Sequence, residues 1–158
     1  MHTALEVARY VVARFQERGD LITNLKLQKL LYYVQGWHLG LEGERAFDGE
    51  FMAWVHGPVN YAVYQEFRAL RWNPITQDVG EVKLDEGLAQ HVDDVLDVYG
   101  GENAWMLERM THAEAPWINA RGDLPPDAEC RNIIRDDDMR AFFAEQAANV
   151  QDQEDASA

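Results

Sequence analysis

The amino-acid sequence predicts a mainly α, single-domain globule of about six helices, with a small β-hairpin between the second and third long helices. Apolar residues recur at spacings of three and four along several segments, which is typical of helices with one buried face. One short stretch alternates between two faces, as a strand does. A chain of 158 residues, 47% of them hydrophobic, can bury one core without disulfides or metals.

The first helix is expected over residues 4–18. Thr3 and Glu6 have the spacing of a capping box, in which each side chain accepts a hydrogen bond from the backbone of the other residue. Apolar residues follow at helical spacing, and Gly19 is placed to end the helix.

The second helix has the strongest periodic pattern. Thr23 and Asn24 are residue types that cap helix starts, and Gly40 or Gly43 can end the helix. Its apolar positions are Leu27, Leu30, Leu31, Val34, Trp37 and Leu41.

A short strand is expected over residues 51–55, paired with a second strand near residues 45–48. The sequence His56-Gly57-Pro58-Val59 is expected to end this strand and to begin the third helix. Gly permits unusual backbone angles, and the fixed φ of Pro suits the first turn of a helix.

The rest of the chain is predicted from apolar spacing and breakers. The expected elements are a third helix over 59–70, a fourth between Asp85 and Gly100, a fifth over 102–112, a turn at Pro116-Trp117 and a last helix from Asp136. The domain should cover residues 1–150. Residues 151–158 have no apolar anchor and are expected to form a disordered acidic tail.

The charge is strongly negative and unevenly placed. The chain has 28 acidic and 14 basic residues, a net charge of −14. Residues 78–102 carry eight acids and one base, residues 123–158 carry ten acids and three bases, and the remainder sums to zero. The best basic cluster is Lys26 and Lys29 with the more distant Arg68 and Arg71. Because this footprint is small, we expect no nucleic-acid partner.

Composition also restricts the chemistry and the cellular location. Cys130 is the only cysteine, so an intrachain disulfide framework is excluded. No run approaches the ~18 apolar residues of a membrane span, and no signal peptide is visible, so we expect a cytoplasmic protein with no membrane partner. The only serine lies in the expected tail, which argues against a serine hydrolase, and no Gly-rich phosphate-binding sequence occurs.

A metal site is the alternative that the sequence leaves open. His38, His56, His112 and Glu114 would form one only if the fold brought separate segments together, since no metal-binding spacing on a single helix occurs. Hydrogen-bonded structural histidines are the simpler interpretation, and no cofactor is expected. A small metal-dependent enzyme using His56 and His112 is retained as the alternative from another functional class.

Two long motifs carry a family resemblance. Their residues, with later matching positions, include Asn24, Lys26, Leu27, Gln28, Lys29, Leu30, Tyr32, Trp37, His38, Trp54, His56, Gly57, Pro58, Val59, Tyr64, Thr111, His112, Glu114, Pro116 and Trp117. With this order and spacing over residues 5–143, the chain resembles the Panacea domain, a family that contains prophage-associated proteins and antitoxins.

The resemblance implies a helical domain that binds a partner and is not an enzyme. It implies an antitoxin that neutralises a cognate toxin, encoded by the adjacent gene, through direct binding. The alternative it implies is an adaptor that delivers the toxin to a Clp-type protease.

Most motif residues have the character of scaffold, so partner choice should belong to exposed residues. Our hypothesis for the partner-binding residues is Lys26, Lys29, Tyr33, Tyr61 and Glu66. Tyr side chains are favoured at interfaces because they bury a large area with few rotatable bonds.

Overall fold

The computed structural model describes residues 1–157 and confirms a mainly α domain with one small hairpin. Its elements are α1 (Ala4–Glu17), α2 (Asn24–Glu42), β1 (Met52–Trp54), β2 (Gly57–Val59), α3 (Tyr61–Phe67), the 3-10 turn η1 (Arg68–Leu70), α4 (Glu86–Tyr99), α5 (Ala104–His112), α6 (Ala115–Arg121) and α7 (Asp136–Ser157). The hairpin lies between α2 and α3, as the sequence predicts.

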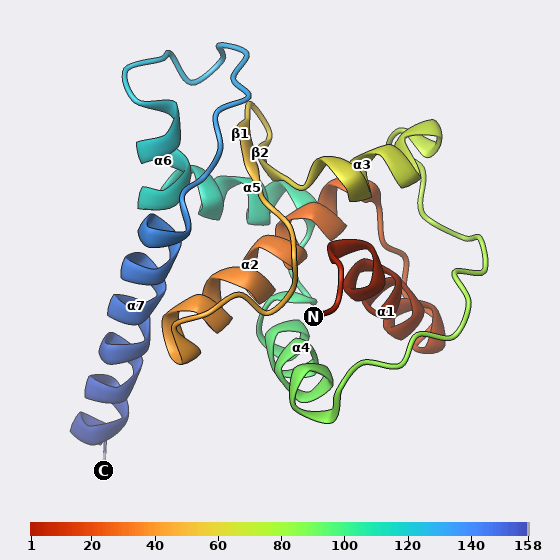
Figure 1. The fold of residues 1–158 in the computed structure, drawn as a ribbon, viewed down its shortest axis with the longest axis horizontal. Coiled ribbons are helices and arrows are strands. Elements are labelled where there is room, and N and C mark those ends of the chain that lie inside the picture. The colour runs from red at the N-terminus through yellow and green to blue at the C-terminus, as the bar shows by residue number, and fades with distance from the viewer. Residues whose placement is uncertain (158) are drawn as a thin grey trace.

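Helix α2 runs through the middle of the molecule (Figure 1). It contacts α1, α3, α4, α5, α7 and β2, and an unbroken run from Leu27 to Gly36 is buried. A helix that is buried on all sides needs apolar residues around its whole circumference or polar ones with internal partners. Both occur here, and the polar residues position the site described below.

The predicted helix caps are largely confirmed. At α1, Thr3 and Glu6 form the capping box. At α2 the Thr23 hydroxyl accepts a hydrogen bond from the backbone of Lys26, so Thr23 is the cap and Asn24 is the first, buried residue of the helix. Gly43 ends α2 in the left-handed conformation, with φ of 80°.

The hairpin forms, but its predicted pairing is wrong. Strand β1 pairs with β2, with Met52 opposite Val59 and Trp54 opposite Gly57. The segment over residues 45–48 contacts the N-terminus instead, through a bridge between Thr3 and Asp48. Residue periodicity does not reveal the pairing of β1 with β2, because Gly57 and Pro58 are typical of a helix start. A Pro within a strand is also unusual away from sheet edges.

Two helix boundaries also differ from the prediction. Helix α3 begins at Tyr61, because the Asn60 side chain caps it by accepting a hydrogen bond from the backbone of Val63. The expected turn at Pro116-Trp117 is the first part of α6, where a Pro is tolerated because its missing N–H would have no helical partner.

Segment 132–134 completes the small β element on the other side of β1. The backbone N–H of Ala53 donates to the carbonyl of Asn132, and that of Ile134 donates to the carbonyl of Phe51. This pairing holds residues 129–131 beside the hairpin.

Helix α7 packs along one side of α2 (Figure 1). A Cβ atom at Gly36 would lie 2.2 Å from the Phe143 ring, and one at Gly40 would lie 2.6 Å from the Phe143 backbone. Two glycines one turn apart therefore permit this close contact.

The last turns of α7 differ from the expected tail. Residues 151–157 continue the helix, with residues 151–156 exposed, whereas the sequence predicts disorder from residue 151. Gln, Glu and Ala have good helix propensity, and an existing helix adds one hydrogen bond per further residue. In the part of the chain that the structure describes, no helix combines the length and apolar character that a membrane crossing requires.

Candidate partner-binding site

A groove of about 610 Å³ opens between the start of α2, the hairpin, the end of α3 with η1, and residues 129–131. We call it the aromatic groove. Its apolar lining is formed by Leu25, Trp54, Val55, Val59, Tyr64 and Trp72. Trp72 is 78% exposed, in a protein whose other large aromatic side chains are mostly packed inside. An exposed Trp beside a hollow is typical of a binding surface.

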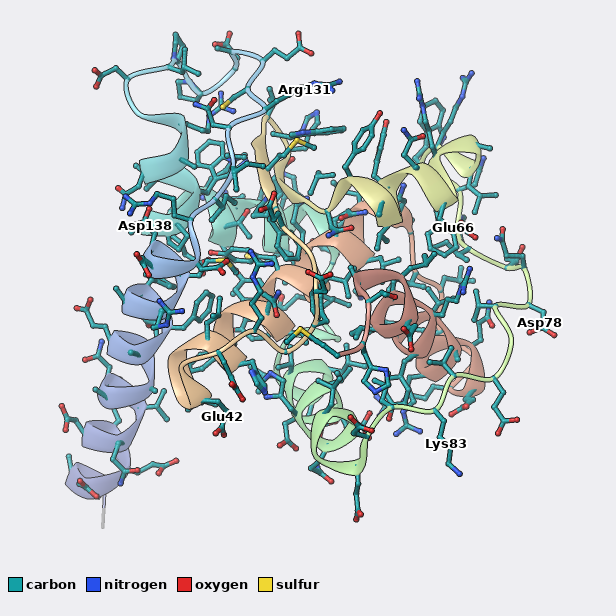
Figure 2. All side chains as sticks on the ribbon, viewed as in Figure 1. Glu42, Glu66, Asp78, Lys83, Arg131 and Asp138 are labelled. Atoms are coloured by element: carbon teal, nitrogen blue, oxygen red, sulfur yellow. The ribbon has the colours of Figure 1, made fainter. Side chains whose placement is uncertain are left out.

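Aromatic rings and one arginine form the wall of this groove nearest the hairpin. The ring centroids of Trp54 and Tyr64 lie 4.8 Å apart, and Tyr61 stacks on Tyr64 at 6.2 Å. The Arg131 guanidinium lies over both Trp54 and Tyr61, 5.6 and 6.0 Å from their ring centroids. Figure 2 shows Arg131 beside the tip of the hairpin. These contacts hold the wall in a defined shape.

The groove is locally positive. Arg68, Arg71 and Arg131 line it together with a single acid, Glu129. Within residues 1–157 none of the three guanidinium groups makes an ion pair, whereas Arg14 and Arg45 pair with carboxylates elsewhere. Three free cations on one groove contrast with the net charge of −14.

Buried amides behind the groove join α2 to the hairpin and α3. Gln28 donates to the Asn24 side chain at 3.1 Å and accepts a hydrogen bond from the backbone of Asn60 at 2.8 Å. Asn24 donates to the carbonyl of Tyr64, and Asn60 donates to the carbonyl of Glu50. Buried polar groups stabilise a fold only when they are satisfied, and this network satisfies them while fixing one wall of the groove.

Gly57 is required by both its backbone and its neighbours. Its φ is +106°, and an added Cβ would lie 2.5 Å from Cε of Lys29 and 3.0 Å from the Thr111 hydroxyl. The Lys29 ammonium donates to the carbonyl of Pro58 at 3.2 Å. The Gly in the His-Gly-Pro sequence therefore allows strand β2 to lie close to the buried Lys29.

Burial strongly affects the charge of Lys29. Desolvation lowers the pKa of Lys29 to about 7, and the nearby Glu108 carboxylate opposes that shift. Glu108 in turn accepts a hydrogen bond from the exposed His56 ring at 2.6 Å. His56, at the rim of the groove, is thus connected to the buried amine through one carboxylate.

Glu114 lies against two buried tyrosines. The hydroxyls of Tyr32 and Tyr33 donate to its two oxygens at 3.1 and 2.9 Å. Burial raises the pKa of Glu114 to about 7, while the two hydrogen bonds act in the opposite direction. Tyr33 also stacks on Tyr99, with ring centroids 4.0 Å apart, and Trp37 donates to the Tyr99 hydroxyl. This cluster joins α2, α4 and the start of α6.

Helix α6 supports the hairpin from behind. The Trp117 indole donates to the carbonyl of Trp54, and the buried Arg121 donates to the carbonyls of Ala53, Pro125 and Ala128. The His112 ring stacks on Trp117 at 4.1 Å, and burial lowers the pKa of His112. These residues support the backbone segments that form the groove, but they do not line the groove.

The remaining motif residues are also internal. Leu27 and Leu30 lie in the core, Thr111 is buried and donates to the carbonyl of Glu108, and Pro116 is buried in α6. The scaffold interpretation of the motifs therefore agrees with their burial.

The residues of the metal hypothesis do not gather at one site: His56 and His112 lie near each other beside Glu108, whereas His38 and Glu114 have other partners. His38 contacts the carbonyl of Glu44, His56 pairs with Glu108, and Glu114 accepts from tyrosines. No group of three or more His, Cys, Asp or Glu residues suited to a metal ion occurs within residues 1–157.

Two of the five hypothetical partner-binding residues are inside the protein. The prediction that Lys29 and Tyr33 lie on an exposed face is wrong, because both are 0% exposed. Other elements enclose the middle of α2 from Leu27 to Gly36, so the polar residues there do not face solvent. Lys26 is partly buried and donates to the carbonyl of Gly100 at 2.7 Å.

The other two lie on α3. Tyr61 is 38% exposed beside the groove, whereas Glu66 pairs with Arg9 of α1 at 3.6 Å. In Figure 2, Glu66 lies well away from Arg131.

The groove is not apparent from the sequence. Arg68 and Arg71 stand out there only as a distant part of the basic cluster with Lys26 and Lys29. Arg131 lies 60 residues further along, in a segment dominated by acids. The available signal was Trp72 preceded by Arg68 and Arg71 after an amphipathic helix, but only the fold shows that Arg131 lines the same groove.

The buried, hydrogen-bonded residues behind the groove lie mostly in the region that matches a known family. Residues 27–118, more than half of the chain, match the family model described as "Antitoxin SocA-like, Panacea domain". The chain belongs to this antitoxin family. The match includes most of α2, the hairpin, α3, α4, α5 and the start of α6, and therefore most of the motif residues and most of the groove.

A curated relative supports the same assignment. Antitoxin SocA of Caulobacter vibrioides (strain NA1000 / CB15N) is 31% identical over 109 residues, which cover 61% of this chain and 58% of that protein. The chain thus aligns with less than two thirds of this relative's length. No solved structure gives a significant match. Arg131 lies beyond the residues that match the family model.

Proposed function

We propose that this Panacea-domain protein is a cytoplasmic antitoxin that neutralises a cognate toxin by direct protein–protein binding, and that the adjacent gene encodes this toxin. The observation that supports it most is the aromatic groove. Exposed Trp and Tyr side chains with unpaired arginines are the residue types that dominate binding energy at protein interfaces.

The contrast between buried, hydrogen-bonded motif residues and exposed groove residues supports binding of a partner over catalysis. The family's polar side chains, such as Gln28 and Lys29, are used in internal hydrogen bonds. The exposed residues around the groove include Tyr61, Trp72 and three arginines. Partner choice therefore belongs mainly to these residues, while the motif residues Trp54, Val59 and Tyr64 contribute to the apolar lining.

Co-expression tests this proposal. The adjacent gene should arrest growth when expressed alone, and this protein should restore growth and co-purify with its product. Trp72→Ala should weaken the complex, since truncating a central interface Trp typically costs more than about 2 kcal/mol. Trp105→Ala is the matched control, because Trp105 is 58% exposed on α5 outside the groove. Failure of the wild-type protein to rescue growth or to form a complex would refute direct neutralisation.

An adaptor role is the second candidate. The C-terminal end of α7 lies at the opposite end of the molecule from the hairpin (Figure 1), and residues 151–156 are exposed. A surface separate from the groove could contact a Clp-type protease while the groove holds the toxin. Toxin half-life should then be shortened by this protein only in cells that contain the protease, whereas simple masking predicts an unchanged half-life.

A further inference from the structure

We infer that the aromatic groove binds an acidic segment of the partner protein that also carries an apolar or aromatic side chain. The inference rests on the proposed function, because the segment belongs to the toxin. Its first basis is charge: the groove offers three arginines against one glutamate, and no described carboxylate pairs with those arginines.

The local charge is informative because the rest of the protein is acidic. With 28 acids and 14 bases, a basic residue on this surface has abundant possible partners. Outside the groove, Arg9, Arg14, Arg45, Arg135 and Arg140 pair with carboxylates, whereas Arg18 and Arg109 make no ion pair within residues 1–157 and are not clustered with other unpaired arginines around one groove. Arg68, Arg71 and Arg131 come from two segments distant in sequence and remain free around one groove. Carboxylates of a partner would complete these charges, since arginine pairs with carboxylates through two parallel hydrogen bonds.

The lining of the groove indicates that charge alone does not fill it. Trp54, Val59 and Tyr64 form an apolar base, and Trp72 stands exposed at its side. A volume of about 610 Å³ lies in the range of pockets that bury a compact apolar group. An aromatic or aliphatic side chain between carboxylates would use both features.

A protein segment fits better than a nucleic acid. Aromatic rings with arginines also suit single-stranded nucleic acids. However, the net charge of −14 opposes a polyanion along its whole length, and Glu129 lies in the groove itself. A short acidic segment meets the three arginines without extending over the acidic surface.

Charge reversal tests the inference in complexes with the adjacent gene's product. Arg71→Glu and Arg131→Glu should each weaken binding by at least about tenfold, because each places a like charge against the acidic segment. Arg135→Glu is the matched control: Arg135 is exposed, lies outside the groove, and has only a weak pair with Asp137 at 3.7 Å. It should bind as the wild-type protein does. If wild type binds and both groove variants bind equally well, the inference fails while the proposed function stands. If wild type does not bind, the proposed function itself fails.

Photo-crosslinking identifies the occupant directly. Trp72→p-benzoylphenylalanine in the complex should crosslink to a toxin peptide that is rich in Asp and Glu and contains an apolar residue, as read by mass spectrometry. A crosslinked peptide of basic composition would overturn the inference, and so would a crosslinked nucleic acid. Thermal unfolding of each variant, compared with wild type, separates lost binding from lost folding.

Discussion

Lys29 shows how a lysine can be part of the scaffold at an energetic cost. Its ammonium is fully enclosed and has one hydrogen-bond acceptor, the carbonyl of Pro58. A lowered pKa means that the folded protein favours the neutral amine. Between about pH 7 and the ordinary lysine pKa of 10.5, the folded state has lost a proton that the unfolded state retains. Stability should therefore rise with pH across that window.

Substitution of Lys29 by Met should remove most of this pH dependence. In the wild-type protein, the free energy of unfolding should rise from pH 7.5 to 9.5 with a slope of up to about 1.4 kcal/mol per pH unit. The Lys29→Met slope should be much smaller. Urea unfolding at several pH values measures it. Lys83→Met, at an exposed lysine, is the control and should keep the wild-type slope. If the free energy of unfolding of Lys29→Met still rose steeply with pH, the lowered pKa of Lys29 would not be its cause.

Glu114 should have the opposite effect in a more acidic window. Its pKa is raised from 4.5 to about 7, so the folded protein keeps a proton that the unfolded chain releases. Stability from this group is present below pH 4.5 and is lost as the pH rises to about 7. The stability difference between wild type and Glu114→Gln should therefore fall by about 1–3 kcal/mol over that range.

The control for Glu114→Gln is a variant that removes an exposed carboxylate. Glu145→Gln on α7 removes the same charge at an exposed position and should show no such trend. Chemical unfolding at pH 5 and pH 7 measures both variants. A constant difference between wild type and Glu114→Gln across the range would show that the carboxyl group titrates normally.

At the scale of elements, the contact between α2 and α7 depends on glycine. Gly36→Ala would place a methyl group against the Phe143 ring, where it has no room. Inserting a methyl group into a packed core typically costs about 1–3 kcal/mol, so the free energy of unfolding should fall by that amount. Gly87→Ala in α4 is the matched control, because nothing lies within 4 Å of its added Cβ. There Ala should stabilise by up to about 1 kcal/mol. Destabilisation of both variants alike would point to helix geometry and not to packing.

Helices were predictable because their information is local. The spacing of apolar residues and the side chains of Thr3 and Thr23 predict α1 and α2 within a residue or two of the structure. The pairing of the hairpin strands was not predictable. β2 contains Gly57 and Pro58, which favour a helix start when only neighbours in sequence are considered. The strand forms because the fold supplies Lys29 for the carbonyl of Pro58 and Gln28 for the backbone of Asn60.

The site was harder to predict for the same reason. Exposure depends on what covers a helix, and nothing within α2 reveals that its middle is enclosed on every side. Lys29 and Tyr33 were therefore assigned to the surface. The groove depends on Arg131 reaching Trp54 across 77 residues of sequence. Family motifs do not help here, since the motif residues largely serve internal contacts.

At the scale of the whole molecule, charge and core are separated. Residues 123–158 carry a net charge of −7, and residues 151–156 are exposed on the end of α7. The apolar part of α7 ends well before, with Phe142 and Phe143 packed on the core. We therefore propose that the folding unit ends near residue 150.

Deletion of residues 151–158 should leave the stability of the domain unchanged within about 0.5 kcal/mol, because residues 151–156 are exposed. Deletion from residue 141 removes Phe142 and Phe143 and should prevent stable folding. Urea unfolding followed by circular dichroism measures both. A loss of more than about 2 kcal/mol in the shorter deletion would place the tail within the folding unit.

The position of α7 in the chain also has a consequence during synthesis. The helix that covers the glycine face of α2 is synthesised after the other described helices, and about 100 residues separate Gly40 from Phe143. At about 5–20 residues per second, α2 waits roughly 5–20 s before the ribosome reaches Phe143. During that time the rings of Tyr32 and Trp37 lack their Phe143 contacts. Nascent chains stalled before residue 143 should therefore be the species most prone to bind chaperones.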